Sequence, residues 1–322
     1  MDLLRLSLER GTTAKHAMEI CIHFLETYGQ GGPCCQEDTD WTYENSFLFA
    51  DANEGYVLET AGIKHWAWER IEAGEFRNIS NGISIRSNWG AVSKDILSTC
   101  TENGWWDGKS KFDWKCALSA GGRAHSNLKA VGREAAGLAH LQAMKEKSDA
   151  MQSALSTQLS PRWWVEQMAG ALRDEDSGLC FRDVLGGFCS TGSQISWLPS
   201  LCIPTSGAHF FTGAPDPLCG TPYKLFTFSD PPTHDVKEDI ENNYKTKELW
   251  DLWRQRSLNH VKRHARKGLE SEEQLMRETL SKMEDDSMRL LECDDATSLK
   301  QSAPFETIVQ KEIELLESFS GS

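Results

Sequence analysis

The chain has 322 residues, of which 39% are hydrophobic and 25% charged, and a formal net charge of −14. This composition is typical of a globular protein with one large or two ordinary domains, and it excludes a disordered tail. Because the acidic excess repels phosphate backbones and anionic membrane surfaces, we expect neither nucleic acid nor a membrane surface as a partner.

The N-terminal residues have helical periodicity. Residues 2–10 predict a short amphipathic helix that ends at Gly11. Thr12 or Thr13 is a candidate cap for a second helix, whose apolar residues recur at three- and four-residue steps. Gly29 occupies the position where such a helix stops. We therefore expect two helices, the second with one apolar face to bury.

From residue 46 the period changes to two. Short β-branched or aromatic runs separated by turn residues predict an antiparallel meander at residues 46–50, 56–60, 65–71 and 76–80. In the third run, Trp66 and Trp68 point to one side, whereas Ala67, Glu69 and Ile71 point to the other. Such a sheet needs helices on at least one face.

Helices and strands then alternate in blocks rather than one by one. Helical patterns occur around residues 94–102, 123–154 and 160–172, and the last has Ser160 as its cap and Pro161 at its first position. Strand patterns return at residues 193–198, 208–212 and 223–228. This segregated order predicts an α+β fold.

The C-terminal third has a different composition. Pro231 and Pro232, with the polar residues after them, predict a linker at 231–244 between a domain at 1–230 and a charged helical tail at 245–322. The tail carries a basic block followed by acidic residues, so two helices of complementary charge are expected. The basic block consists of Arg254, Arg256, Lys262, Arg263, Arg266 and Lys267.

The sequence also indicates a location. No run approaches the roughly 20 apolar residues that cross a bilayer, and Arg5 and Glu9 interrupt the hydrophobic start. We therefore expect no signal peptide and no membrane span. The ten cysteines are then expected to stay thiols in a reducing compartment. Together these features predict a soluble, cytoplasmic protein.

The familiar catalytic motifs are absent. The sequence has no GxGxxG after a strand, no GxxxxGK[ST], no HExxH, no GxSxG and no CxxC pair, so we expect no cofactor and no metal. His260 and His264 lie four residues apart on a predicted helix. Two ligands do not close a metal site that needs three or four, so a solvated helix face is favoured over a metal site.

Three other features have both a chemical and an ordinary interpretation. Cys34 and Cys35 lie in a loop where a reactive thiol is conceivable, but no neighbouring base is evident, so an ordinary loop cysteine is favoured. The tryptophan-rich strand at 65–71 is favoured as core or interface over a ligand platform. The basic block suggests nucleic-acid or phosphoinositide binding, which the acidic helix downstream disfavours.

Several motifs in a fixed order resemble those of one family. They are YGQGG at 28–32, SFL at 46–48, VLETAG at 57–62, WA at 66–67, RNISN at 77–81, GWWDG at 104–108, LRD at 172–174, SWLP at 196–199 and HFFTG at 209–213. In this order they resemble the secernins, which belong to the dipeptidase A family of cysteine-type peptidases. The resemblance is strong over residues 1–114, patchy to about 230 and weak in the tail.

The resemblance implies a fold and a mechanism. The implied fold is an N-terminal-nucleophile hydrolase-like αββα sandwich, in which helical layers enclose two antiparallel sheets. In this family an N-terminal cysteine attacks an amide carbonyl, its own α-amine acts as the base, and water hydrolyses the thioester. The implied substrates are small peptides or amides, typically dipeptides. The family's association with regulated secretion offers an alternative, a non-catalytic protein of exocytosis that docks a protein partner through the tail.

The sequence departs from the family pattern at the nucleophile. The chain begins at a helix that the family places about a quarter of the way along, so the nucleophile segment and the first strands are expected to be missing. Neither Met1 nor Asp2 carries a thiol, so the chain is expected to be inactive by this mechanism. An incomplete gene model or an alternative start would explain this. Uncovered strand edges predict a poorly soluble or marginally folded chain.

Asn81 is the one catalytic residue that the resemblance transfers. It matches the position where relatives place an asparagine beside the nucleophile, so the implied role is a contact to the amine or to the oxyanion. The alternative is an asparagine that satisfies turn backbone. Pro33 stands where the family's glycine-rich loop continues with asparagine, and proline removes a backbone donor there.

Overall fold

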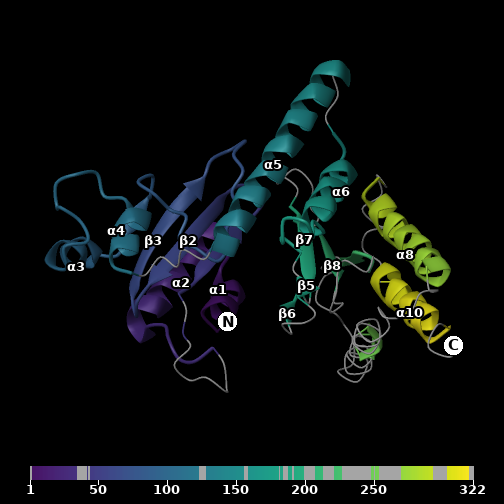
Figure 1. Ribbon diagram of the computed structural model, residues 1–322, viewed down its shortest axis with the longest axis horizontal. Coiled ribbons are helices and arrows are strands. Elements are labelled where there is room, and N and C mark those ends of the chain that lie inside the picture. The colour runs from purple at the N-terminus through teal and green to yellow at the C-terminus, as the bar shows by residue number, and fades with distance from the viewer. Residues whose placement is uncertain are drawn as a thin grey trace. The chain divides into compact units, whose positions relative to one another are not determined.

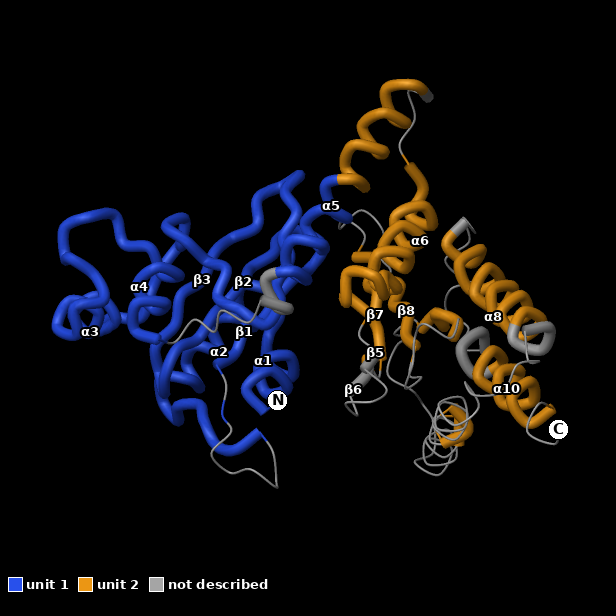
Figure 2. The backbone as a smooth tube through the Cα atoms, viewed as in Figure 1, with its two compact units in different colours: residues 1–142 blue, residues 143–322 orange. Residues whose placement is uncertain are grey.

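The computed structural model forms two compact units, residues 1–142 and residues 143–322 (Figure 2). The described residues are 2–34, 42, 44–122, 128–155, 159–180, 182–183, 188–190, 192–198, 207–212, 221–226, 248–249, 251–253, 270–292 and 303–318. The helix α5 (Leu128–Leu155) contributes residues to both units.

Unit 1 begins with the two expected helices (Figure 1). They are α1 (Asp2–Arg10) and α2 (Ala14–Tyr28). Of the two candidate caps, Thr13 is the one used, since its hydroxyl accepts a hydrogen bond from the His16 N–H at 3.1 Å. Gly29 ends α2 with φ of 79°, a conformation that favours glycine. Both predicted helices are confirmed.

The sheet of unit 1 has four antiparallel strands in chain order. They are β1 (Ser46–Ala50), β2 (Gly55–Ala61), β3 (His65–Ile71) and β4 (Ala91–Val92). The first three predicted strands are therefore confirmed.

The predicted fourth strand at 76–80 is wrong. Residues 75–80 have no regular structure, and Ala91 pairs with Trp68 of β3 instead. Side chains of the irregular segment form hydrogen bonds with distant residues, which replace a strand ladder. Gly90 permits the new pairing, because a Cβ there would lie 1.9 Å from the Trp68 ring.

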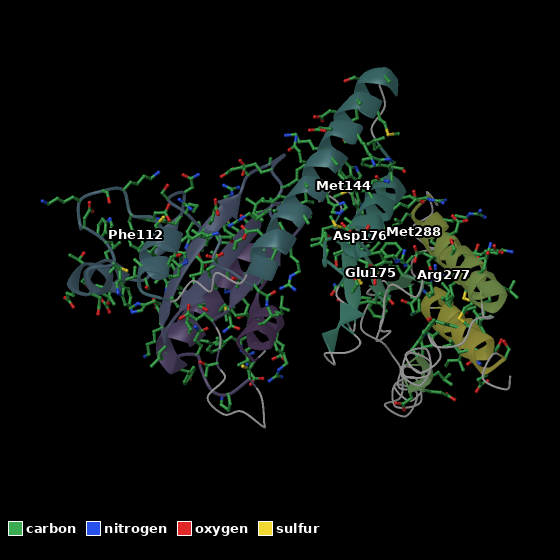
Figure 3. All side chains as sticks on the ribbon, in the orientation of Figure 1. Phe112, Met144, Glu175, Asp176, Arg277 and Met288 are labelled. Carbon is green, nitrogen blue, oxygen red and sulfur yellow. The ribbon has the colours of Figure 1, made fainter. Side chains whose placement is uncertain are left out.

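The sheet lies between two apolar layers, and the side-chain alternation of β3 separates them. Trp66 and Trp68 pack with α1 and α2, while Ala67 faces the opposite layer, as predicted. That second layer contains α3 (Ile96–Glu102), α4 (Trp114–Ala120) and Phe112, which Figure 3 labels. Helices thus cover both faces of β2 and β3.

Unit 2 contains a three-stranded antiparallel sheet in the order β7-β8-β9 and a short β5-β6 pair. The strands are β5 (Arg182–Asp183), β6 (Phe188–Cys189), β7 (Ser193–Trp197), β8 (Ala208–Thr212) and β9 (Lys224–Phe226). The helices are α6 (Pro161–Leu172), α8 (Glu270–Arg289), the 3-10 turn η2 (Leu290–Glu292) and α10 (Ala303–Ser318).

The core of unit 2 combines helix and sheet. Ser160 caps α6 as predicted, since its hydroxyl accepts from the Trp163 N–H at 3.3 Å. Val165 of α6 packs with Phe210 of β8 and with Met288 of α8, which Figure 3 labels. The sequence leaves open whether the tail packs on the sheet, and in the structure α8 and α10 both contact β9.

The whole is a mixed α+β fold, in agreement with the segregated order of the sequence patterns. The predicted linker at 231–244 lies outside the described residues. In the predicted tail, the described part comprises helical residues 248–249 and 251–253, followed by α8, η2 and α10.

Candidate functional site

The candidate site is built on the segment 77–85, which lies within the connection between β3 and β4 and includes the RNISN motif. The segment follows a turn in which Gly74 adopts φ of 82°. Because the segment has no strand ladder of its own, side-chain hydrogen bonds must hold it in place. Three sets of such bonds do so, from β2, from β3 and from α5.

The first set centres on a buried carboxylate. Glu59 of β2 is only 1% exposed, on the face of the sheet that packs against residues 83–118. It accepts hydrogen bonds from the backbone N–H groups of Ser84 at 2.7 Å and Ile85 at 3.1 Å. The Ser84 hydroxyl donates a further, short hydrogen bond to the same carboxylate. Glu59 therefore fixes the end of the segment to β2.

The environment of Glu59 shifts its ionisation. Burial raises the pKa of Glu59 above its ordinary value, because the charged form loses its hydration. The hydrogen bonds from Ser84 and Ile85 and the charge of Arg77 oppose this effect without cancelling it. The Glu59 carboxyl group therefore takes up a proton at higher pH than an exposed one does.

The second set links the segment to β3 through Arg77. Its Nη2 atom donates to the Ser84 hydroxyl at 2.8 Å and to Glu69 of β3 at 3.1 Å. A chain of contacts therefore runs from Glu59 through the Ser84 hydroxyl to Arg77 and Glu69. The Arg77 Nε atom is buried and has no hydrogen-bond partner among the described residues, so the guanidinium keeps one donor for a further acceptor.

The third set comes from α5. The Asn78 side-chain amide donates to the backbone carbonyl of Glu134 at 3.0 Å. Gly137 makes this approach possible, because a Cβ at that position would lie 2.5 Å from the Asn78 amide nitrogen. The segment is thus anchored on α5 as well as on the sheet.

Asn81, the residue that the resemblance transfers, lies at the exposed end of the motif. Its Oδ1 atom accepts a hydrogen bond from Nη2 of Arg133 on α5 at 2.9 Å. Because Oδ1 is engaged, the group that Asn81 offers to an approaching ligand is the Nδ2 amide, a hydrogen-bond donor. An anchored amide donor at the surface is suited to contact a carbonyl oxygen or an oxyanion.

The buried cluster itself does not have the arrangement of a nucleophile and its base. The Ser84 hydroxyl donates to Glu59 and accepts from Arg77, and Ser84 is 9% exposed. A hydroxyl enclosed in this way has no access to a substrate. The cluster therefore supports the segment, and the exposed Asn81, at the end of the RNISN motif, is the residue placed to meet a ligand.

Two of the buried thiols are disfavoured as nucleophiles. Burial raises the pKa of Cys21 and of Cys100, which disfavours the reactive thiolate. Cys34, in the predicted loop, is exposed, whereas Cys35 lies outside the described residues.

Two of the other candidates from the sequence fall on residues that the structure does not describe. His260, His264 and the basic block lie outside the described residues. Within the described ranges, no group of three or more His, Cys, Asp or Glu side chains is placed to hold a metal ion. The tryptophan-rich strand contributes to a core cluster, and the Trp66 indole donates to Glu26 at 2.9 Å.

Reasoning from the sequence missed Glu59, Arg77, Ser84 and Glu69 as a connected group. One signal was available for Glu59. It is a charged residue among apolar neighbours in the strand pattern, on the same side of the strand as Val57 and Ala61. A carboxylate on the inward face of a strand requires buried donors, so its position indicates a polar cluster.

In the part of the chain that the structure describes, no helix combines the length and the apolar character that a bilayer crossing requires. No family model matches the chain.

Proposed function

We propose that the chain belongs to the secernin-like group of the dipeptidase A family and that its site handles small peptides or other amides. The observation that carries the proposal is the exposed Asn81, whose Oδ1 atom is held by Arg133 so that its amide group is presented as a donor. This is the chemistry that stabilises the oxyanion formed when a thiol attacks an amide carbonyl. The ordered motifs between residues 28 and 213 support the proposed family.

The proposed mechanism divides the work between Asn81 and a nucleophile. The thiol of an N-terminal cysteine attacks the amide carbon, its proton passes through the terminal amine to the leaving nitrogen, and the carbonyl oxygen becomes negative. Asn81 donates its amide hydrogen to that oxygen. Water then hydrolyses the thioester and releases the acid. The mechanism requires the thiol and the free amine on one residue, and Met1 does not provide a thiol.

The test compares two forms of the protein in a dipeptide-release assay. A polypeptide of these 322 residues is expected to release no amino acid. A form that carries an N-terminal cysteine ahead of these residues in the same reading frame is expected to be active, and Asn81→Ala is expected to lower its kcat by about 10²- to 10³-fold. The matched control is Asn88→Ala, because Asn88 is also exposed and lies in the same connection between β3 and β4.

The outcomes separate the alternatives. Dipeptide release by the 322-residue polypeptide alone would overturn the mechanism. If Asn81→Ala and Asn88→Ala lower kcat equally, Asn81 is not the oxyanion donor. A folded form with an N-terminal cysteine and no amidase activity would favour the non-catalytic interaction protein instead.

A further inference from the structure

A second polar site lies in unit 2, where helix α8 meets the end of α6. The carboxylate of Glu284 on α8 accepts hydrogen bonds from both terminal nitrogens of Arg173, with Nη1 at 2.8 Å. The backbone N–H of Tyr223 donates to the same carboxylate at 2.9 Å. A guanidinium fork with an added backbone donor matches the geometry of a carboxylate.

The donors of this site are held by contacts of their own. Arg173 also donates to the backbone carbonyl of Thr221 at 2.8 Å, and its guanidinium lies 4.8 Å from the centre of the Tyr223 ring. The Tyr223 hydroxyl in turn donates to Ser193 at 2.6 Å. The orientation of Arg173 therefore does not depend on Glu284 alone, and the site should keep its shape without that carboxylate.

The site is charged and largely enclosed. The side chains of Arg173 and Glu284 are 25% and 15% exposed. Burial tends to lower the pKa of Arg173, but the hydrogen bond and the charge of Glu284 outweigh it and raise that pKa. The Arg173 Nε atom is buried and has no hydrogen-bond partner among the described residues. The largely buried Arg173 guanidinium therefore favours an anionic group at the position that the Glu284 carboxylate occupies.

Helix α8 has further attachments close to Glu284. Asp285 pairs with Arg162 of α6, and Met288 packs in the core of unit 2. Removing the Glu284 side chain therefore leaves α8 in place and vacates the space beside Arg173.

We propose that Arg173 and the backbone N–H of Tyr223 form a carboxylate-binding site whose internal ligand is Glu284 of α8. A small free carboxylate, such as acetate or the C-terminal carboxylate of a dipeptide, occupies the site when Glu284 is replaced. In the unaltered chain the tethered Glu284 excludes such ligands, because an intramolecular group has a high effective concentration. This inference is independent of the proposed amidase function.

The experiment measures the thermal midpoint of the full chain in sodium acetate and in sodium chloride of equal ionic strength. The test variant is Glu284→Ala, and its matched control is Glu278→Ala, which removes an exposed carboxylate from the same helix. Acetate is expected to raise the midpoint of Glu284→Ala above its value in chloride. At ten times its dissociation constant it should shift the folding equilibrium about 11-fold. The unaltered chain and Glu278→Ala should respond equally to the two salts.

Two further arms test the ligand and the donor. A dipeptide with a free C-terminal carboxylate should stabilise Glu284→Ala, whereas the same dipeptide amidated at its C-terminus should not. A response to acetate but to neither dipeptide restricts the site to small free acids. Replacing Arg173 by Leu in the Glu284→Ala background should abolish the response to acetate.

The proposal is overturned if Glu284→Ala responds equally to acetate and chloride, or if the response persists without Arg173. If Glu284→Ala does not fold in chloride, the refolding yield in acetate replaces the midpoint as the readout. A yield no higher in acetate than in chloride then also overturns the proposal.

Discussion

Each compact unit contains a fully buried carboxylate, and the two carboxylates have different partners. Glu59 of unit 1 and Glu312 of unit 2 are 1% and 0% exposed. Glu59 accepts from two backbone N–H groups and a hydroxyl. Glu312 accepts from the Lys224 ammonium at 2.8 Å and from the Trp253 indole at 2.7 Å.

The difference lies in where the compensating charge sits. In unit 1 Arg77 is linked to Glu59 by hydrogen bonds only through the Ser84 hydroxyl. In unit 2 Lys224 contacts Glu312 directly, and the two side chains are 4% and 0% exposed. Losing the cation in unit 2 leaves the buried Glu312 without its direct ion-pair partner, whereas Glu59 has only neutral hydrogen-bond donors in direct contact. Removing one partner of the buried carboxylate should therefore destabilise unit 2 more than unit 1.

The largest expected effect tests the pair in unit 2. Lys224→Met should lower the free energy of unfolding by about 3–5 kcal/mol, because Glu312 would remain buried without its cation. Urea denaturation measures the change. Lys311→Met, on the exposed side of α10, is the control and should change stability little. The double variant Lys224→Met with Glu312→Leu should recover most of the loss, and failure to recover would contradict the role of the charge.

A smaller effect is expected in unit 1. Glu59→Gln keeps the size of the side chain but removes the charge and places an NH₂ group against donors, so we expect a loss of about 2 kcal/mol. The same denaturation assay applies, with the exposed Glu102→Gln as the control. A loss as large as that of Lys224→Met would remove the contrast between the two units.

The pH dependence of stability sharpens the comparison further. The folded-state pKa of Glu59 is raised above its ordinary value of 4.5. At pH values between 4.5 and the raised folded-state pKa, the carboxyl group holds a proton in the folded state that it has released in the unfolded state. The free energy of unfolding therefore falls as pH rises through this window. The stability difference between the unaltered chain and Glu59→Gln should therefore decrease with rising pH across the window. A difference that is constant or increases with pH would contradict the raised pKa.

Much of the fold was predictable because its signals are local. Thr13, Ser160 and Gly29 act within one turn of the helices that they limit, and the alternation of Trp66 and Ala67 needs only the strand period. Such features depend on residues a few positions apart. The helices and strands identified in this way were mostly confirmed.

The hydrogen bonds of the candidate site could not be predicted from the sequence, because they join residues that are far apart in the chain. Glu59 meets Ser84 across 25 positions and Asn81 meets Arg133 across 52. The wrong strand at 76–80 also involves a distant partner, because Asn78 binds the Glu134 carbonyl 56 positions away. The division between the compact units falls inside α5, where no proline-rich or glycine-rich linker marks it.

The Lys224–Glu312 pair also affects how the protein is made. Its two residues are 88 positions apart, so at about 5–20 residues per second the ribosome adds the acid roughly 4–18 s after the lysine. Until α10 emerges, Lys224 of β9 lacks the acidic partner that the structure gives it. The core of unit 2 therefore cannot be completed before residue 312 has been synthesised, and a nascent chain that stops before residue 312 is expected to remain a substrate for chaperones and proteases.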